Sequence, residues 1–207
     1  MSPLENILKN KLVAILRGYD TAEVLEIIQA LYDGGIRLVE VTLNSTNALK
    51  SIEKAKSEFG GQMEIGAGTV LNAKSAKKAI TAGASFIISP TFDFETIAMT
   101  KQMGAVSIPG AFSPTEIYQA HQAGADIVKI FPSILGPDYI KNVLGPLDEI
   151  RLMPTGGVKS DNITAYLEVG AVAFGIGGGL LNTLTGLDPM TQISKNAAEF
   201  VEALNAN

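Results

Sequence analysis

The sequence predicts an α/β protein, a (β/α)8 barrel of the TIM type that forms one domain over residues 1–207. Short apolar runs alternate eight times with amphipathic segments of helical length. The runs lack polar alternation, which is typical of parallel strands covered on both faces. A helix–Gly–Ala–strand step recurs at Ala82-Gly83-Ala84, Ala123-Gly124-Ala125 and Gly170-Ala171, and it indicates a repeated βα unit. An open doubly wound sheet would also alternate strands and helices, but eight near-equal units without a long crossover favour closure.

The predicted elements begin with a short helix over residues 3–11. The eight strands are expected at residues 12–17, 38–43, 64–70, 86–90, 105–110, 126–132, 151–157 and 171–178. Helices are expected between them. The first follows Asp20 and carries an apolar stripe at helical spacing. Ser113, Pro114 and Glu116 form a capping-box pattern with proline at the first helical position, and they predict the start of another helix.

The composition excludes several classes of protein. The chain has 207 residues, a mass of 21.8 kDa, a formal charge of −5 and a pI near 4.9, which argues against nucleic acid as a partner. It has no cysteine and one histidine, His121, so disulfides, thiol nucleophiles and histidine-cluster metal sites are ruled out. We find no targeting segment and no apolar run of membrane-spanning length, so we expect a soluble, cytoplasmic protein.

Three ionisable residues interrupt the apolar runs near their ends: Arg17, Glu40 and Lys129. In a (β/α)8 barrel the active site lies at the carboxyl ends of the strands. Charged side chains are costly to bury, so each of the three is expected to be either paired or functional. They are therefore the first candidates for catalysis, whereas His121 lies on a predicted outer helix and is expected at the surface.

Lys129 is the strongest candidate because apolar residues flank it on both sides. Burial lowers the pKa of an amine, and a neutral lysine can attack a carbonyl to form a Schiff base. The alternative is a strand lysine whose stem packs inside while its ammonium reaches solvent or a carboxylate. The barrel context, with a carboxylate on another strand, favours the catalytic interpretation.

Glu40 and Arg17 each have a structural alternative. Glu40 can carry protons between water, the carbinolamine and the α-carbon of an enamine, or it can form a structural ion pair with Lys129 or Arg17. Arg17 offers a planar fork for a carboxylate or phosphate, or it can clamp the first strand to its neighbours. Both interpretations of Arg17 remain open at this point.

Glycine-rich segments end the last two predicted strands. Thr155, Gly156 and Gly157 follow the seventh strand, and Gly177 and Gly178 end the eighth. Loops at these positions commonly bind phosphate through backbone N–H groups, often with a short following helix, expected here at 180–182. A tight turn would explain one such pair of glycines, but it explains two glycine pairs on adjacent strands less readily. The sequence therefore predicts a phosphorylated substrate.

The whole chain resembles the aldolase family that acts on 2-keto-3-deoxy-6-phosphogluconate and 4-hydroxy-2-oxoglutarate. The motifs that carry the resemblance are AILRG at 14–18, GGIRLVEVTL at 34–43, IGAGTVL at 65–71, ISP at 88–90, PGAFSPTE at 109–116, VKIFP at 128–132 and MPTGGV at 153–158.

The resemblance implies a class I aldolase, a lyase of the Entner–Doudoroff type of carbohydrate metabolism. It implies Lys129 as the Schiff-base lysine, Glu40 as the proton-transfer residue and Thr69 as a contact of the pyruvoyl group. It assigns the phosphate end to Arg17, Thr155, Gly156, Gly157, Gly177 and Gly178. We also expect Asn44, Pro90 and Phe131, which lie at or near the ends of predicted strands, to contact the substrate. The resemblance further implies a homotrimer that uses no metal and no cofactor.

Two positions depart from the family pattern. Asn44 stands where phosphogluconate-type members usually carry an arginine that contacts the pyruvate carboxylate, and Gly178 stands where members usually carry a serine. The Asn44 segment is similar to the branch that cleaves 2-keto-3-deoxy-6-phosphogalactonate, whereas Pro154-Thr155-Gly156 follows the phosphogluconate pattern.

We therefore expect cleavage of a 2-keto-3-deoxy-6-phosphoaldonate of the gluconate type to pyruvate and glyceraldehyde 3-phosphate. The same chemistry on the galactonate-type substrate is the alternative. An isomerase or epimerase of sugar phosphates is less favoured, because it needs two acid–base residues and only Glu40 is well placed. A non-catalytic module that binds a phosphorylated ligand is the third hypothesis.

Overall fold

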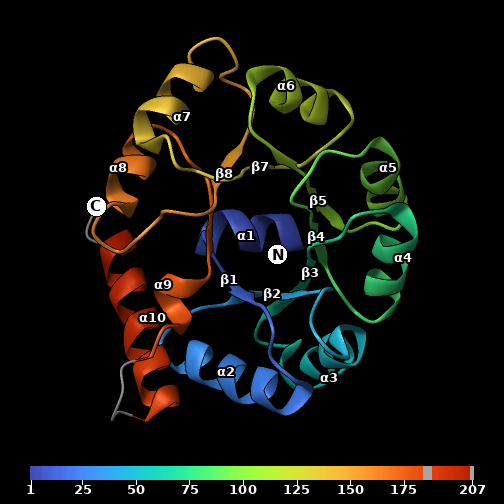
Figure 1. The fold of residues 1–207 in the computed structure, drawn as a ribbon, viewed down its shortest axis with the longest axis vertical. Coiled ribbons are helices and arrows are strands. Elements are labelled where there is room, and N and C mark those ends of the chain that lie inside the picture. The colour runs from blue at the N-terminus through green and yellow to red at the C-terminus, as the bar shows by residue number, and fades with distance from the viewer. Residues whose placement is uncertain (184–187, 206–207) are drawn as a thin grey trace.

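A computed structural model describes residues 1–183 and 188–205 of the chain (Figure 1). The strands in these residues are β1 (Leu12–Leu16), β2 (Leu38–Thr42), β3 (Glu64–Gly68), β4 (Phe86–Ile88), β5 (Val106–Ile108), β6 (Gly110–Ala111), β7 (Val128–Ile130), β8 (Leu152–Pro154) and β9 (Phe174–Ile176). The helices are α1 (Pro3–Asn10), α2 (Thr21–Asp33), α3 (Ala48–Phe59), α4 (Ala73–Thr81), α5 (Phe94–Gln102), α6 (Pro114–Gln122), α7 (Gly136–Leu144), α8 (Ile163–Glu168), α9 (Gly178–Leu181) and α10 (Pro189–Asn205). None of the described helices is long and apolar enough to cross a membrane.

All eight predicted runs contain strands, but the fifth run contains two. Val106–Ile108 and Gly110–Ala111 are separated by Pro109, which has no N–H to donate to a neighbouring strand. β5 consequently pairs with β4, and β6 pairs with β7. The helix starts agree with the sequence patterns, since Asp20 and Ser113 both cap helices through capping boxes with Glu23 and Glu116.

The strands form two parallel sheets. One contains six strands in the order β5-β4-β3-β2-β1-β9 and curls into a half-barrel, and the other contains β6-β7-β8. A parallel bridge between Thr155 and Gly175 connects the end of β8 to β9. Figure 1 shows α2 to α8 and α10 around the outside of the strands. The fold is therefore an α/β fold built on curled parallel sheets.

The strands bury side chains on both faces, as the apolar runs predict. Alternate residues such as Val39 and Val41 of β2 belong to the large cluster of buried residues that includes the apolar faces of the helices. Leu38 of β2 instead joins a second cluster on the inner face, with Val13, Phe86 and others. The two-residue period of a strand therefore places Leu38 and Glu40 on the same, inner side.

Helix α1 covers the amino ends of the strands. It lies across the centre of the view in Figure 1, and its Ile7 is fully buried in the inner cluster. The Asn6 side chain donates a hydrogen bond to Glu64 Oε1 (2.7 Å), and Ser85 Oγ donates one to Glu64 Oε2 (2.7 Å). Since Glu64 begins β3 and Ser85 directly precedes β4, α1 closes this end and leaves the carboxyl ends of the strands for a site.

Candidate active site

Lys129 is the central residue of β7 and points to the inner side. It pairs with Gly110 on one neighbouring strand and with Met153 on the other, and it is only 5% exposed. Its Nζ lies 4.9 Å from the centre of the Phe131 ring, which follows two residues later on the same side of the strand. The lysine is therefore held in a largely apolar setting at the carboxyl end of the strands.

Burial lowers the pKa of Lys129, because desolvation disfavours the ammonium form. The negative charge of Glu40 opposes this shift, and the positive charge of Arg17 reinforces it. A lowered pKa increases the fraction of neutral amine near neutral pH. Only the neutral amine is a nucleophile toward a carbonyl carbon.

Glu40 lies at the centre of β2, with Ile15 of β1 and Gly66 of β3 as its neighbours in register. Its carboxyl group lies over Gly68, where an added Cβ would come within 2.6 Å of the carboxyl carbon. Glycine at position 68 is thus what makes room for the Glu40 carboxyl group. The side chain is 1% exposed, and its Oε2 is buried without a hydrogen-bond partner.

Desolvation raises the pKa of Glu40, and the positive charges of Lys129 and Arg17 act in the opposite direction. Glu40 and Lys129 are close enough to affect each other's pKa, but they form no ion pair with each other. The structural ion pair considered as an alternative for Glu40 is thus not present in the described residues. A buried carboxylate oxygen without a partner is unusual, and it leaves an acceptor for a substrate group or a water.

Arg17 directly follows β1 and contacts the ends of two further strands. Its Nη1 donates a hydrogen bond to Asn44 Oδ1 (3.2 Å), and its Nη2 donates one to Thr69 Oγ1 (3.3 Å). These bonds join the carboxyl ends of β1, β2 and β3, as the clamp interpretation expects. They leave most of the five N–H donors of the guanidinium without a protein partner. Arg17 is exposed, so it can also meet a ligand.

Thr155 directly follows β8 and faces inward. It is 3% exposed, and its Oγ1 is buried without a hydrogen-bond partner. The hydroxyl lies against β9, where a Cβ added at Gly175 would approach Oγ1 to 2.4 Å. Its hydroxyl is therefore buried against β9 rather than exposed in the loop that follows, and like the Glu40 oxygen it has no hydrogen-bond partner.

The glycines after β8 and β9 lie at the same edge. Gly156 and Gly157 have φ angles of 87° and 84°, in the left-handed region that favours glycine. Gly177 and Gly178 lie at the start of the short helix α9, which begins two residues earlier than the predicted start at residue 180.

Pro90 follows β4 half-buried, and a Cβ added at Gly110 would come within 2.4 Å of its backbone. Phe131 is 40% exposed beside Lys129.

Sequence analysis did not identify the buried pair Ser133 and Tyr166. The Tyr166 hydroxyl donates a hydrogen bond to the Ser133 carbonyl oxygen (3.1 Å), and Ser133 Oγ donates one to that hydroxyl (3.3 Å). The Ser133 N–H donates to the carbonyl oxygen of Thr155 (2.9 Å). Tyr166 thereby supports the segments that follow β7 and β8. No sequence signal distinguishes it from other aromatic residues on an amphipathic helix.

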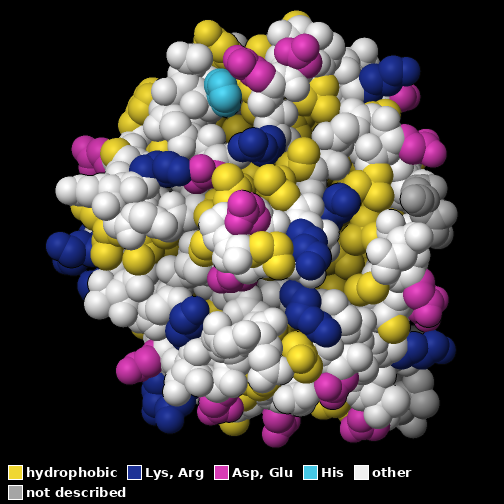
Figure 2. Space-filling model, turned by 180° about the vertical axis from the view of Figure 1, so that it is seen from behind, with side chains coloured by type: hydrophobic (Ala, Val, Ile, Leu, Met, Phe, Trp, Pro, Cys, Tyr) yellow, Lys and Arg dark blue, Asp and Glu magenta, His cyan; other side chains and the backbone are white. Residues whose placement is uncertain are grey.

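His121 lies away from these residues. It is near the carboxyl end of α6, and helices of a βα unit run back from the carboxyl ends of the strands. Figure 2 shows it at the surface of the face opposite to the viewer of Figure 1, and its Nε2 lies 3.6 Å from Glu149 Oε1. In the part of the chain that the structure describes, no three His, Asp or Glu residues cluster as metal ligands would.

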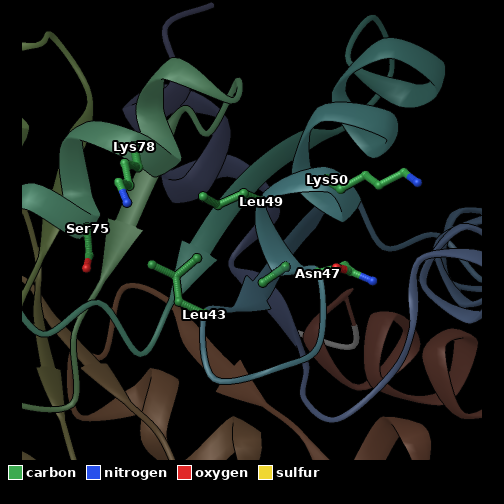
Figure 3. A pocket seen from close by; sticks show the side chains of 7 residues that line it. Leu43, Asn47, Leu49, Lys50, Ser75 and Lys78 are labelled. Carbon is green, nitrogen blue, oxygen red and sulfur yellow. The ribbon is translucent and has the colours of Figure 1, made fainter.

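A surface cavity of about 500 Å³ lies outside the strands, between α3 and α4 (Figure 3). Leu43 and Asn47, which line it, lie at the two ends of the loop after β2. Asn44 belongs to this loop, so the cavity borders the site on its outer side.

Comparison with known proteins gives consistent results. A family model described as "KDPG and KHG aldolase" matches residues 4–195. KDPG stands for 2-keto-3-deoxy-6-phosphogluconate, and KHG stands for 4-hydroxy-2-oxoglutarate. The 2-dehydro-3-deoxy-6-phosphogalactonate aldolase of Escherichia coli K12 is 34% identical over 197 residues, which cover 94% of this chain and 95% of that protein. The 2-dehydro-3-deoxy-phosphogluconate aldolase of Pseudomonas aeruginosa is 36% identical over 150 residues, which cover 72% of this chain and 68% of that protein.

Two solved structures are similar over nearly the whole chain. A native KDPGal structure superposes with a TM-score of 0.88 at 34% identity and covers 94% of both chains. A KDPG aldolase from Legionella pneumophila, with pyruvate captured as a covalent carbinolamine intermediate, superposes with a TM-score of 0.82 at 26% identity and covers 100% of this chain and 98% of that chain.

Proposed function

Because the chain belongs to the KDPG and KHG aldolase family, we propose that it cleaves a 2-keto-3-deoxy-6-phosphoaldonate of the gluconate type to pyruvate and glyceraldehyde 3-phosphate. The chain is thus a lyase of a carbon–carbon bond. The observation that carries the proposal for its site is the buried Lys129 beside Glu40, whose Oε2 has no partner. These two groups supply the nucleophile and the proton carrier that a Schiff-base aldolase needs.

In the proposed reaction the neutral Lys129 amine adds to the C2 ketone and forms a carbinolamine. Glu40, whose raised pKa favours the protonated carboxyl, donates a proton to the C2 hydroxyl as it leaves as water. The product is a protonated iminium between Lys129 Nζ and C2. The positive nitrogen then serves as an electron sink for cleavage of the C3–C4 bond.

Glu40 is now a carboxylate and accepts the proton of the C4 hydroxyl, directly or through a water. The C3–C4 bonding electrons move to the iminium and form an enamine, while C4 becomes the aldehyde of glyceraldehyde 3-phosphate. Glu40 or its water returns a proton to C3, and water hydrolyses the resulting iminium. Pyruvate leaves and Lys129 regains its amine.

We assign the phosphate end to the segments after β8 and β9. Gly156 and Gly157 carry no Cβ that would hinder approach to their own backbone N–H groups, and Gly177 and Gly178 lie at the start of α9. Charge-assisted hydrogen bonds from backbone N–H groups hold phosphate well and orient the scissile bond. Thr155, with its unpartnered inward hydroxyl, is suited to a polar group of the substrate between the phosphate and Lys129. Thr69, Asn44, Pro90 and Phe131 complete the proposed site.

The galactonate-type substrate is the second candidate. The E. coli relative named for it aligns over 94% of this chain, and Asn44 resembles that branch. The two substrates differ in configuration at C4, so parallel cleavage assays with both epimers decide between them. A higher kcat/KM for the galactonate-type epimer would reverse our assignment.

We also propose that the two sheets close into one (β/α)8 barrel. The Thr155–Gly175 bridge and the short connection through Pro109 between β5 and β6 support closure on both sides.

For assembly we propose a homotrimer. Exposed apolar side chains on the segments after β4 and β7, namely Phe94 (58% exposed), Ile134 (72%) and Leu135 (53%), offer a surface that a second copy would bury. Sedimentation of the protein tests the trimer. A cytoplasmic location is proposed because a phosphorylated, charged substrate does not cross a membrane unaided.

Borohydride trapping tests the proposed chemistry. The protein is incubated with pyruvate and reduced, and the adduct is mapped by peptide mass spectrometry, with Lys129→Met as the control variant. We expect an adduct on Lys129 that the variant lacks. Absence of any adduct at saturating pyruvate would remove the aldolase mechanism and favour a sugar-phosphate isomerase or a binding module.

A further inference from the structure

Arg17 is a cation without an acidic partner at the carboxyl end of the strands. Among the described residues no carboxylate forms an ion pair with it. Its two side-chain hydrogen bonds go to neutral acceptors, Asn44 Oδ1 and Thr69 Oγ1. Neutral acceptors orient the guanidinium without cancelling its charge, so the planar fork remains available to an anion.

The bonds of Arg17 also decide toward which part of the site it turns. In the six-stranded sheet β1 lies between β2 and β9. Arg17 reaches the ends of β2 and β3, on the side of Glu40, and not the glycine segments after β8 and β9. Its charge lowers the pKa of both Glu40 and Lys129, so it lies within electrostatic reach of both reacting groups.

The loop that carries Asn44 is fixed to the ends of the same strands. The Leu43 N–H donates to the Gly68 carbonyl oxygen (2.8 Å), and the Ser45 N–H donates to the Thr42 carbonyl oxygen (3.0 Å). Ser45 Oγ accepts a hydrogen bond from the N–H of Gly18, the residue after Arg17 (2.8 Å). Figure 3 shows Leu43 at the start of this loop, where it lines the outer cavity. Asn44 is therefore held where it can orient Arg17.

We propose that Arg17, oriented by Asn44 and Thr69, binds the C1 carboxylate of the keto acid, and that Asn44 is the positioning residue for this contact. This inference rests on the proposed function, because it concerns the same site and the same substrate. C1 is bonded directly to C2, the carbon that Lys129 attacks, so the carboxylate must lie beside the Lys129–Glu40 pair. A guanidinium there offsets the repulsion between the substrate carboxylate and an ionised Glu40. The family pattern instead assigns Arg17 to the phosphate, so the two assignments predict different results.

Pyruvate separates the two assignments because it has the carboxylate and lacks the phosphate. We would measure borohydride trapping on Lys129 as a function of pyruvate concentration in the wild type, Arg17→Met, Asn44→Ala and the control Arg151→Met, whose exposed side chain lies at the amino end of β8. A charge-assisted pair contributes about 1.5–3 kcal/mol. We therefore expect Arg17→Met to raise the half-saturating pyruvate concentration roughly 10- to 100-fold. Asn44→Ala should raise it severalfold, and Arg151→Met should leave it unchanged.

Asn44→Asp distinguishes ligand binding from a structural clamp. The new carboxylate retains or strengthens the bond to Arg17, so a clamp would keep its function. If Arg17 binds the substrate carboxylate, the aspartate competes for it and weakens pyruvate trapping as much as Arg17→Met does. Inhibition of trapping by inorganic phosphate provides the converse test, since we expect Arg17→Met to leave the phosphate inhibition constant unchanged.

Normal pyruvate trapping in Arg17→Met, together with weakened inhibition by phosphate, would overturn the inference and place the cation at the phosphate end. Normal trapping in Asn44→Asp would overturn the role of Asn44. Failure of the wild type to trap pyruvate on Lys129 would instead overturn the proposed function itself.

Discussion

Gly68 tests whether the position of the Glu40 carboxyl group controls the reaction. A Cβ added at Gly68 would lie 2.6 Å from Glu40 Cδ and 2.7 Å from each carboxyl oxygen. Ordinary contact begins at 3.4 Å, so in Gly68→Ala the carboxyl group must move by about 0.8 Å. Gly68 is buried, pairs with Thr42 of β2 and accepts a hydrogen bond from the Leu43 N–H, so the backbone has little freedom to absorb the overlap.

A displacement of about 1 Å of a catalytic group costs on the order of 100-fold in rate. We therefore expect kcat/KM for aldol cleavage to fall about 100-fold in Gly68→Ala, which corresponds to about 2.7 kcal/mol of transition-state stabilisation. The extra methyl in a filled interior should also lower the free energy of unfolding by about 1–3 kcal/mol. Pyruvate release is followed with lactate dehydrogenase and NADH, and unfolding is followed by denaturant titration.

Gly61→Ala is the matched control, because a Cβ there meets nothing within 4 Å. A second control is a double-mutant cycle with Glu40→Gln. If Gly68→Ala acts through Glu40, it should cost little further activity in the Glu40→Gln background. Activity of Gly68→Ala equal to that of Gly61→Ala, or losses that simply add in the double mutant, would refute the reasoning.

Three further predictions concern single side chains. Glu40→Gln should abolish most activity yet unfold with a free energy higher by about 1 kcal/mol at neutral pH, since Oε2 is buried without a partner. Because the pKa of Glu40 is raised in the folded protein, the folded protein keeps this proton to a higher pH than the unfolded chain does, and wild-type stability falls as pH rises through that window. Denaturant titrations at pH 4 and pH 8 should therefore show that the difference in unfolding free energy between Glu40→Gln and the wild type widens with pH. A difference that stays constant would contradict this prediction. Thr155→Val replaces an unpartnered hydroxyl by an isosteric methyl. It should lower kcat/KM and leave the melting temperature unchanged or slightly higher. A clear loss of stability would instead indicate that the hydroxyl has a structural role. Tyr166→Phe removes the hydrogen bonds to Ser133 and should cost about 1–2 kcal/mol of unfolding free energy. It should also raise KM for the phosphorylated substrate more than it lowers kcat. Tyr118→Phe, which changes an exposed side chain, is the control.

Local sequence was sufficient to predict the strands and the inner positions of the key residues. The apolar runs predicted all eight strand regions, because strands buried on both faces need nearly continuous apolar residues. Glu40 and Lys129 stood out because a charge inside such a run is costly. The capping boxes at Asp20 and Ser113 were likewise readable, since a cap involves residues only three positions apart.

Contacts between strands were decided by the tertiary structure. The sequence could not show that Glu40 and Lys129 lie close without an ion pair, or that Thr155 turns its hydroxyl inward against Gly175. It left open whether Arg17 faces a carboxylate or a phosphate, and its bonds to Asn44 and Thr69 span 27 and 52 positions along the chain. Strand periodicity assigns a side chain to a face. Which groups it meets there depends on the register and curvature of neighbouring strands, and these are set only when the whole sheet packs.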